Sequence, residues 1–382
     1  MTNHQETSPL LHHGGAPSSS ATPYSASTAS SVTASTDTPD TAAQRHQETR
    51  GLIYMTLSAL FFSFMSLLVS LTAKSLPSFQ IVLFRGIVQT ILGVIACHYL
   101  DISPFGNKGV RFLLFCRGLA GSFGLGFFFY GLSVLPLADA TVIFFLGPVF
   151  TAILGRIVLK EPFTPLDALA STVSMIGVIL VAKPSVLFPP PAPSPGDQIN
   201  PLMVTILRRD EEEHRMLGAL ACLCGAMCSA VAYVLVRKIG KQGAHSMQHV
   251  TYFGVVSCLV STLGLYTLQG GYVAPSGTLI WVGILVLGVS AFIGQILLNS
   301  GLQLAPLGPG TLMRMNDIVF AFFFQITIQH EHPDFFSFMG ATLVMICTGG
   351  MALNKWRLEK KRASQEKLDQ ENNSAQGPGS SV

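Results

Sequence analysis

The stretch GLSVLPL at residues 131–137 resembles GLQLAPL at residues 301–307, with Gly, Leu, Pro and Leu at the same positions of both. The offset of 170 (301 − 131) also carries Glu161 onto Glu331. Upstream, an offset of 168 (246 − 78) aligns SFQIVLFRG, residues 78–86, with SMQHVTYFG, residues 246–254. Because the matches keep the same order along the chain, we interpret the sequence as two copies of one unit.

The composition indicates that both copies lie in a membrane. Of the 382 residues, 49% are hydrophobic and 11% are charged, against about 25% charged residues in soluble domains. Apolar stretches of roughly 20 residues are long enough, as helices, to cross a hydrocarbon core of ~30 Å. We therefore predict an all-α membrane protein with ten transmembrane helices, five in each copy. The predicted spans are Leu52–Ala73, Phe79–Leu100, Phe112–Val134, Ala138–Val158, Leu166–Ala182, Met216–Val236, Met247–Leu268, Thr278–Leu302, Pro309–Gln329 and Phe335–Leu353.

The odd number of spans in each copy determines how the copies are related. After five crossings the chain enters the membrane from the opposite side, so the second copy is inverted. Inverted repeats are typical of secondary transporters, which bind their solute near mid-membrane between the halves. The predicted domains are a disordered tail (1–50), the first repeat (51–183), a Pro-rich and charged linker loop (184–215), the second repeat (216–354) and a second disordered tail (355–382).

One stretch of the first copy resembles a known family. RGLAGSFGLGFFFYGLSVLPLADAT, residues 117–141, and LKEPF, residues 159–163, resemble the EamA repeat of the drug/metabolite transporter superfamily. The second half, with MNDIVFAFFFQ at residues 315–325, is most similar to solute carrier family 35, subfamily G. The resemblance implies a ten-helix transporter of small organic solutes built from two inverted EamA repeats, and it does not specify the substrate.

Polar side chains inside the spans are the candidates for a substrate site. An ionisable group at membrane depth costs about 3 kcal/mol on insertion scales, so such groups tend to face an internal cavity. In the ninth span Arg314, Asp317 and Gln325 share one face of a continuous helix, and Asn316 lies beside them. The other candidate substrate-binding residues are Arg85, Gln89, Arg117, Gln295 and Asn299, and Gly147 and Pro148 are the candidate kink or gate of the fourth span.

Comparison of the two copies makes Arg314 and Asp317 the leading candidates. At the offset of 170, the equivalent residues of the first copy are Phe144 and Gly147. A pair of charges needed only for the scaffold would be expected in both copies. With Arg85 and Arg117, the cations outnumber the one aspartate, which favours an anionic solute such as a carboxylate or phosphate ester.

Each candidate also has a structural interpretation. Arg85 and Arg117 lie near span ends and could extend to the headgroups, and Arg314 and Asp317 could neutralise each other. Stripes of Gln and Asn are often hydrogen bonds between helices. Glu161 we read as a residue of the span boundary. Proton coupling through Asp317 stays open, and the sequence does not favour it.

The leading functional hypothesis is a secondary transporter or exchanger of a small organic anion. The alternatives are a nucleotide-sugar transporter of the secretory pathway and a membrane regulatory partner that transports nothing. We expect no enzyme and no ATP-driven pump, because the chain has no G-x-S-x-G, H-E-x-x-H or Walker motif. We expect no cofactor or metal either, since all seven cysteines fall within or beside spans without further ligands.

The loop charges and the N-terminal tail address location and partners. Lys and Arg gather in the loops on one side, which predicts that both termini are cytoplasmic. The motif ETSPLL, with Glu6, Leu10 and Leu11, resembles an acidic dileucine signal for a clathrin adaptor. We expect an endolysosomal, vacuolar or plasma membrane, with the endoplasmic reticulum or Golgi as the alternative. Other expected partners are a small-molecule substrate and the lipid bilayer, with a homodimer left open; the net charge of +3 predicts no nucleic acid.

Overall fold

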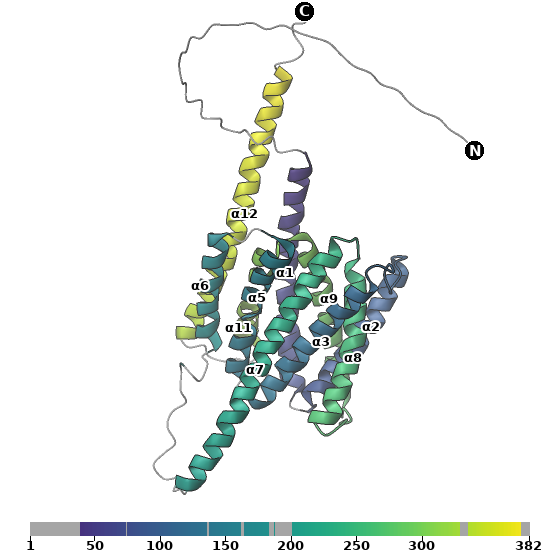
Figure 1. Ribbon diagram of the computed structural model, residues 1–382, viewed down its shortest axis with the longest axis vertical. Helices are drawn as coiled ribbons and strands as arrows, with labels where there is room; N and C mark the ends of the chain where they lie inside the picture. The colour runs from purple at the N-terminus through teal and green to yellow at the C-terminus, as the bar shows by residue number, and fades with distance from the viewer. Residues whose placement is uncertain are drawn as a thin grey trace, which may run out of the picture. The chain divides into compact units, whose positions relative to one another are not determined.

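The computed structural model describes residues 39–73, 75–135, 137–161, 164–182, 187, 201–328 and 335–375. Within these ranges the chain forms twelve helices and no strand (Figure 1). They are α1 (Pro39–Thr72), α2 (Ser78–Tyr99), α3 (Arg111–Val134), α4 (Leu137–Phe144), α5 (Gly147–Leu159), α6 (Pro165–Ala182), α7 (Pro201–Gly240), α8 (Ser246–Leu268), α9 (Thr278–Leu304), α10 (Leu307–Met313), α11 (Asn316–Ile328) and α12 (Phe335–Ala375).

These helices provide ten segments that are long and apolar enough to cross a membrane among the described residues. The predicted all-α fold with ten transmembrane helices is therefore confirmed. Two of the ten segments consist of two helices each, because Asp139–Leu159 contains most of α4 and all of α5, and Leu307–Ile328 contains α10 and α11.

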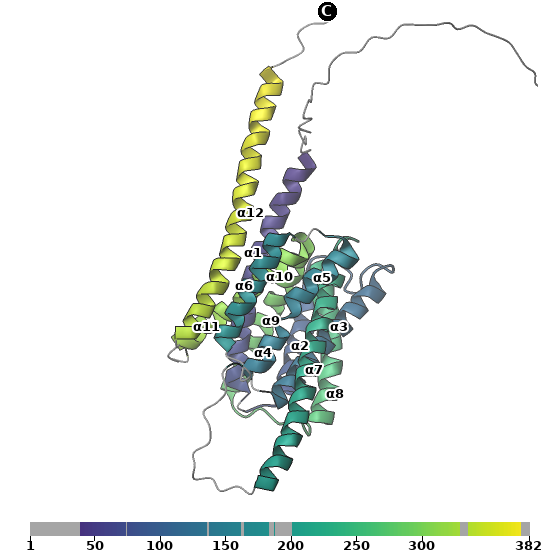
Figure 2. The same cartoon turned by 60° about the vertical axis from the view of Figure 1, so that its left-hand side comes forward.

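Three helices extend beyond the spans into regions that we expected to be irregular. α1 begins at Pro39 in the predicted N-terminal tail, α7 begins at Pro201 in the predicted linker, and α12 continues to Ala375 in the predicted C-terminal tail. These helical extensions differ from the disordered tails and the linker loop that we expected, because Ala, Gln, Glu, Lys and Arg have high helix propensity and continue the backbone hydrogen bonds of the adjoining span. Residues 1–38, 188–200 and 376–382 lie outside the described part of the chain. The extensions of α1 and α12 project from one end of the bundle and that of α7 from the other (Figure 2).

The two copies interlock rather than lie beside each other. α1 packs on α9 as α3 packs on α7, and α1 packs on α11 as α5 packs on α7. α2 and α6 pack on their own repeat counterparts, α8 and α12. Such exchanged pairs are what a two-fold relation between the first six and the last six helices requires, so the predicted inverted repeat is present in the packing.

The pseudo-two-fold axis passes between α2 and α8. Gly86 and Gly254, which the offset of 168 aligns, face each other there. A Cβ atom on either glycine would lie 3.3 Å from the carbonyl oxygen of the other. The residues one position earlier, Arg85 and Phe253, are also aligned by the repeat and also lie close together. The guanidinium carbon of Arg85 lies 5.4 Å from the centroid of the Phe253 ring. Residues matched by the sequence repeat are thus neighbours in space.

Two further glycines bring helices of the different copies into close approach. A Cβ atom on Gly301 of α9 would lie 2.7 Å from the Cγ of Met55 and 3.0 Å from the carbonyl oxygen of Gly51, both on α1. A Cβ atom on its counterpart Gly131 of α3 would collide with the Sγ of Cys222 on α7 and lie 3.3 Å from the carbonyl oxygen of Gly218. A side chain at either position requires its neighbours to shift, and close backbone packing of this kind holds membrane helices together.

Candidate functional site

The fourth and ninth spans are interrupted at repeat-equivalent places. α4 and α5 are separated at Phe145 and Leu146, and α10 and α11 are separated at Arg314 and Met315. A tight turn connects the two helices in each span. The N–H of Leu146 donates to the carbonyl of Ile143 at 3.1 Å, and the N–H of Met315 donates to the carbonyl of Leu312 at 3.0 Å. Interrupted helices between inverted repeats are a recurrent setting for transporter sites. The side chains beside the interruptions are therefore candidates for the functional site.

Pro148 and Asn316 account for the two interruptions in different ways. Pro148 stands at the second position of α5, where a missing N–H costs no helical hydrogen bond. The predicted kink residues Gly147 and Pro148 thus begin the second half of the broken helix. In the other copy, the amide nitrogen of Asn316 donates to the carbonyl of Met313 at 3.0 Å, and its amide oxygen accepts from the hydroxyl of Thr348 on α12 at 2.8 Å. Asn316 is therefore held by the scaffold in this conformation.

Arg85 and Arg117 meet at one aromatic ring. The guanidinium carbon of Arg117 lies 4.8 Å from the centroid of Phe253, the same ring that Arg85 approaches to 5.4 Å. Both arginines are buried, with 5% and 2% of their surface exposed. They enter from α2 and α3, while Phe253 lies on α8. A headgroup-facing position, the structural alternative for both residues, does not agree with this burial.

Arg117 also binds the polar stripe of α9. Its Nη2 donates to Oε1 of Gln295 at 3.2 Å and to Oδ1 of Asn299 at 3.0 Å. Gln89 of α2 donates to the carbonyl of Val250 on α8 at 3.0 Å. Five of the sequence candidates therefore gather around α8, and four of the five are no more than 5% exposed.

Several hydrogen-bond donors in this cluster have no partner among the described residues. They are Nε of Arg85, Nε and Nη1 of Arg117, and Nδ2 of Asn299, all buried. The ion pairs of the described residues include neither arginine. Buried donors and charges without partners are costly, and native proteins satisfy nearly all of them. The cluster formed by Arg85, Arg117, Phe253, Gln295 and Asn299, which we call the arginine cluster, therefore contains buried donors that no described residue satisfies.

Arg314 and Asp317 form a separate group that is already neutral. Nη1 of Arg314 lies 3.2 Å from Oδ2 of Asp317, and the Arg314 guanidinium lies 4.2 Å from the centroid of Phe62 on α1. Oδ1 of Asp317 accepts a hydrogen bond of 2.5 Å from the hydroxyl of Ser63. Gln325, expected on the same face, is exposed near the end of α11. The structure thus joins Arg314 to Asp317 and separates Gln325 from them.

Tyr233 of α7 connects the two groups. It lies close enough to interact electrostatically with both Arg117 and Arg314. Sequence reasoning missed Tyr233, Phe253 and Ser63, because a lone Tyr, Phe or Ser in an apolar helix looks like ordinary core. The one available indication was the repeat, which aligns Phe253 with Arg85.

The comparisons with known proteins agree with this architecture. Residues 49–183 and 216–352 each match the EamA-like transporter family. The chain belongs to that family. It is 31% identical over 306 residues to human solute carrier family 35 member G1, with 80% of each chain covered. An uncharacterized membrane protein of Saccharomyces cerevisiae is 30% identical over 313 residues, with 78% of this chain and 74% of its own covered.

More distant relatives extend the same pattern. The pseudopaline exporter CntI of Pseudomonas aeruginosa is 24% identical, with 80% of this chain and 96% of its own covered. A crystal structure with 15% identity covers 78% of this chain at a TM-score of 0.63 and shows the fold alone. The chain is therefore a membrane protein of a transporter family, similar to subfamily G of solute carrier family 35.

A second polar cluster joins the copies of this EamA protein at one end of the bundle. Glu161, just after α5, lies 2.8 Å from Nε of Arg237 on α7 and accepts the backbone N–H of Leu307, the first residue of α10, at 2.8 Å. Lys241 lies 3.7 Å from the same carboxylate, and Arg237 also donates to the carbonyl of Gln303. Glu161 therefore holds two helices of the second copy, which is more than the boundary role that we expected.

Glu161→Gln is expected to destabilise the folded protein by roughly 2–4 kcal/mol, because it leaves the largely buried Arg237 without a countercharge. Hydrogen exchange followed by mass spectrometry should show faster exchange at the start of α10, where the N–H of Leu307 loses its charged acceptor. Asp101→Asn, an exposed carboxylate changed in the same way, is the matched control. Equal exchange at α10 in both variants would contradict this connection between the copies.

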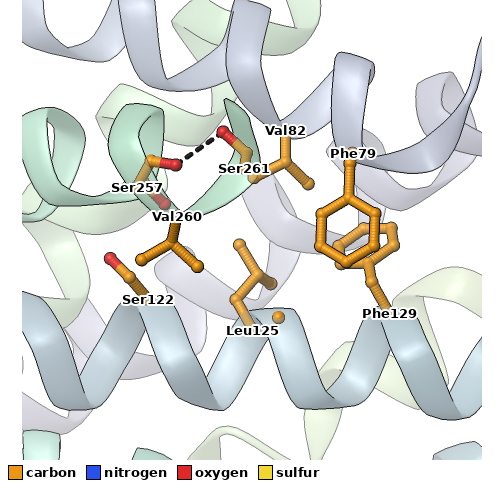
Figure 3. Close-up of a pocket in the computed structure, with 9 residues that line it drawn as sticks. Phe79, Val82, Ser122, Leu125, Phe129, Ser257, Val260 and Ser261 are labelled. Atoms are coloured by element: carbon orange, nitrogen blue, oxygen red, sulfur yellow. Dashed lines mark hydrogen bonds between the residues drawn. The ribbon is translucent and has the colours of Figure 1, made fainter. Parts of the chain in front are cut away.

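A small cavity adjoins the arginine cluster between α2, α3 and α8 (Figure 3). Phe79, Val82, Leu125, Phe129 and Val260 line it together with three serines, Ser122, Ser257 and Ser261. Its water-accessible volume is about 10 Å³, room for roughly one water molecule. A cavity of this size cannot hold an organic solute in this conformation.

Proposed function

We propose that this EamA protein is a secondary transporter or exchanger of a small organic anion, whose negative group binds between Arg85 and Arg117. The observation that carries the proposal is the set of buried donors without partners in the arginine cluster. A carboxylate or phosphate offers several acceptor oxygens in the planar geometry that guanidinium groups bind best. Such a group would supply both the acceptors and the charge that the cluster lacks.

The charge balance supports an anion over a neutral or cationic solute. Arg314 and Asp317 neutralise each other, while Arg85 and Arg117 keep two positive charges away from water. An uncompensated buried charge costs several kcal/mol. Binding an anion would recover much of that cost, whereas a cation would add to it. The proposed substrate site therefore centres on Arg85 and Arg117. Tyr233 connects it to Arg314 and Asp317, which would border the site.

The fold supports movement of that anion by alternating access. The two broken helices occupy equivalent places in inverted copies, so exchange of their conformations would turn the site from one side of the membrane to the other. The Glu161 contacts close one end of the interface between the copies in this conformation. We infer that these contacts break when that end opens.

Counterflow in proteoliposomes tests the proposed function. Vesicles loaded with an unlabelled solute are diluted into the same solute carrying label, and the panel holds dicarboxylates, tricarboxylates, phosphate esters, neutral sugars and cationic amines. We expect label to accumulate for at least one carboxylate or phosphate ester and for no cationic amine. Flux of a neutral or cationic solute with none for any anion would overturn the proposal.

A further inference from the structure

His249 of α8 is buried without a hydrogen-bond partner. Its exposed fraction is 0%, and neither Nδ1 nor Nε2 has a partner among the described residues. A neutral imidazole has one donor and one acceptor to satisfy, so both of its polar atoms are unsatisfied. His249 lies one helical turn before Phe253, the ring on which the two arginines meet. The histidine therefore adjoins the arginine cluster.

The groups around His249 are cationic or neutral. Across from it, α3 supplies Arg117, which acts on it electrostatically, and α2 supplies Arg85, whose guanidinium carbon lies 5.4 Å from the centroid of Phe253. The three helices α2, α3 and α8 contain no Asp or Glu; their other titratable residues are Cys97, His98, Tyr99, Arg111, Cys116, Tyr130, Tyr252, Cys258 and Tyr266. The α9 residues that accept from Arg117 are the neutral Gln295 and Asn299. His245 lies one turn earlier on its own helix, where burial lowers its pKa and keeps it neutral near pH 7.

We propose that His249 binds a proton that is transported together with the anion, an inference that rests on the proposed function. A ring nitrogen of His249 takes a proton from a hydronium ion on the side to which the site is open, so one O–H bond breaks, one N–H bond forms and a water molecule remains. The N–H bond breaks when the site opens to the other side, where a water molecule binds the proton and becomes hydronium. No electron is transferred, and the imidazole returns to its starting form after each cycle.

The arginine cluster explains why the proton and the anion would bind together. In the empty site, a proton on His249 would place a third positive charge beside two guanidinium groups, and charges a few ångströms apart in a dry interior repel strongly. A bound carboxylate or phosphate offsets the guanidinium charges and offers an acceptor to the new N–H. The loaded site then holds both ligands, and the empty site holds neither.

Asp317 is less suited to this role than His249. Its carboxylate is already bound to Arg314 and to the hydroxyl of Ser63. A proton there would break an existing ion pair, whereas a proton on His249 would form an N–H from which the bound anion can accept a hydrogen bond. The geometry therefore assigns the proton to the histidine.

A pH jump on wild-type proteoliposomes tests the inference without any variant. Vesicles at pH 7.5 containing a pH-sensitive dye are mixed with the anion that gives the strongest counterflow, at external pH 6.0 and with no solute inside. We expect anion uptake at least about 10-fold above that at equal pH, accompanied by acidification of the lumen that depends on the anion. Counterflow without either effect would overturn proton transport and leave the proposed function standing. Absence of counterflow would overturn the proposed function as well.

His249→Gln tests the assignment to this residue, because glutamine keeps hydrogen-bonding groups but binds no proton. We expect the ratio of uptake driven by the pH gradient to counterflow to fall at least about 10-fold. His98→Gln, at an exposed position near the end of α2, should keep the wild-type ratio. An unchanged ratio in His249→Gln would overturn the assignment. If that variant does not fold, the dye measurement on the wild type still decides whether a proton moves with the anion.

Discussion

Arg117→Met is expected to reduce anion counterflow by at least about 100-fold in protein that remains folded. The substitution keeps much of the side-chain volume but removes the charge and all donors from the centre of the arginine cluster. Removing one partner of a buried, charged hydrogen-bonded group costs about 2–5 kcal/mol, and each 1.4 kcal/mol is a factor of ten. Initial rates of labelled-anion counterflow, normalised to monodisperse protein, provide the measurement.

Two further variants test whether the loss of counterflow is due to the buried guanidinium of Arg117. Arg156→Met removes an exposed arginine of α5 and should leave the rate within about twofold of the wild type. Arg117→Lys keeps the charge but loses the planar fork, and its rate should lie between those of the wild type and Arg117→Met. Wild-type flux in Arg117→Met would exclude the arginine cluster as the binding site and favour the Arg314–Asp317 group.

Gly301→Ala is expected to destabilise the interface of α1 and α9. The added Cβ atom would lie 2.7 Å from the Cγ of Met55 and 3.0 Å from the carbonyl oxygen of Gly51, so the Met55 side chain and the adjoining backbone must shift. Overpacking of this kind costs typically 1–3 kcal/mol, and a fall in the melting temperature of several degrees should follow. Thermal unfolding in detergent, monitored by size-exclusion chromatography, measures the change.

Gly126→Ala is the matched control for this prediction. Its Cβ atom would lie 3.6 Å from Val260, at ordinary contact distance, and Gly126 lines the small cavity of Figure 3. We expect a change of less than about 0.5 kcal/mol there. If both glycine variants melt together with the wild type, the two copies are not packed as tightly at Gly301 as the structure indicates.

The spans and the repeat could be predicted because both depend on properties that act along the chain. Apolar stretches of sufficient length locate the membrane helices, and the offsets of 170 and 168 locate the second copy. The helical extensions from Pro39, from Pro201 and to Ala375 were missed, because polar composition was taken to indicate disordered tails and a linker loop although those residues also favour helices.

The site was harder to predict, because contacts between helices decide it. Sequence reasoning ranked Arg314 and Asp317 first and assumed that Gln325 continued their helix face. The interruption after Met313 breaks that periodicity, and the structure leaves Gln325 exposed. Nothing in the spacing along the chain shows that Arg85 and Arg117 meet at Phe253, since that contact depends on how three separate helices pack.

The contact of Gly86 with Gly254 and of Arg85 with Phe253 has a consequence for the origin of the protein. If a single unit once paired with an antiparallel copy of itself, the residue at position 85 would have faced its own duplicate across the dimer. Two arginines in that place would repel each other, and two phenylalanines would carry no charge. Fusion of the duplicated genes would allow the two positions to diverge. One chain could then place a guanidinium against a ring, a combination that no symmetric homodimer can contain on its axis.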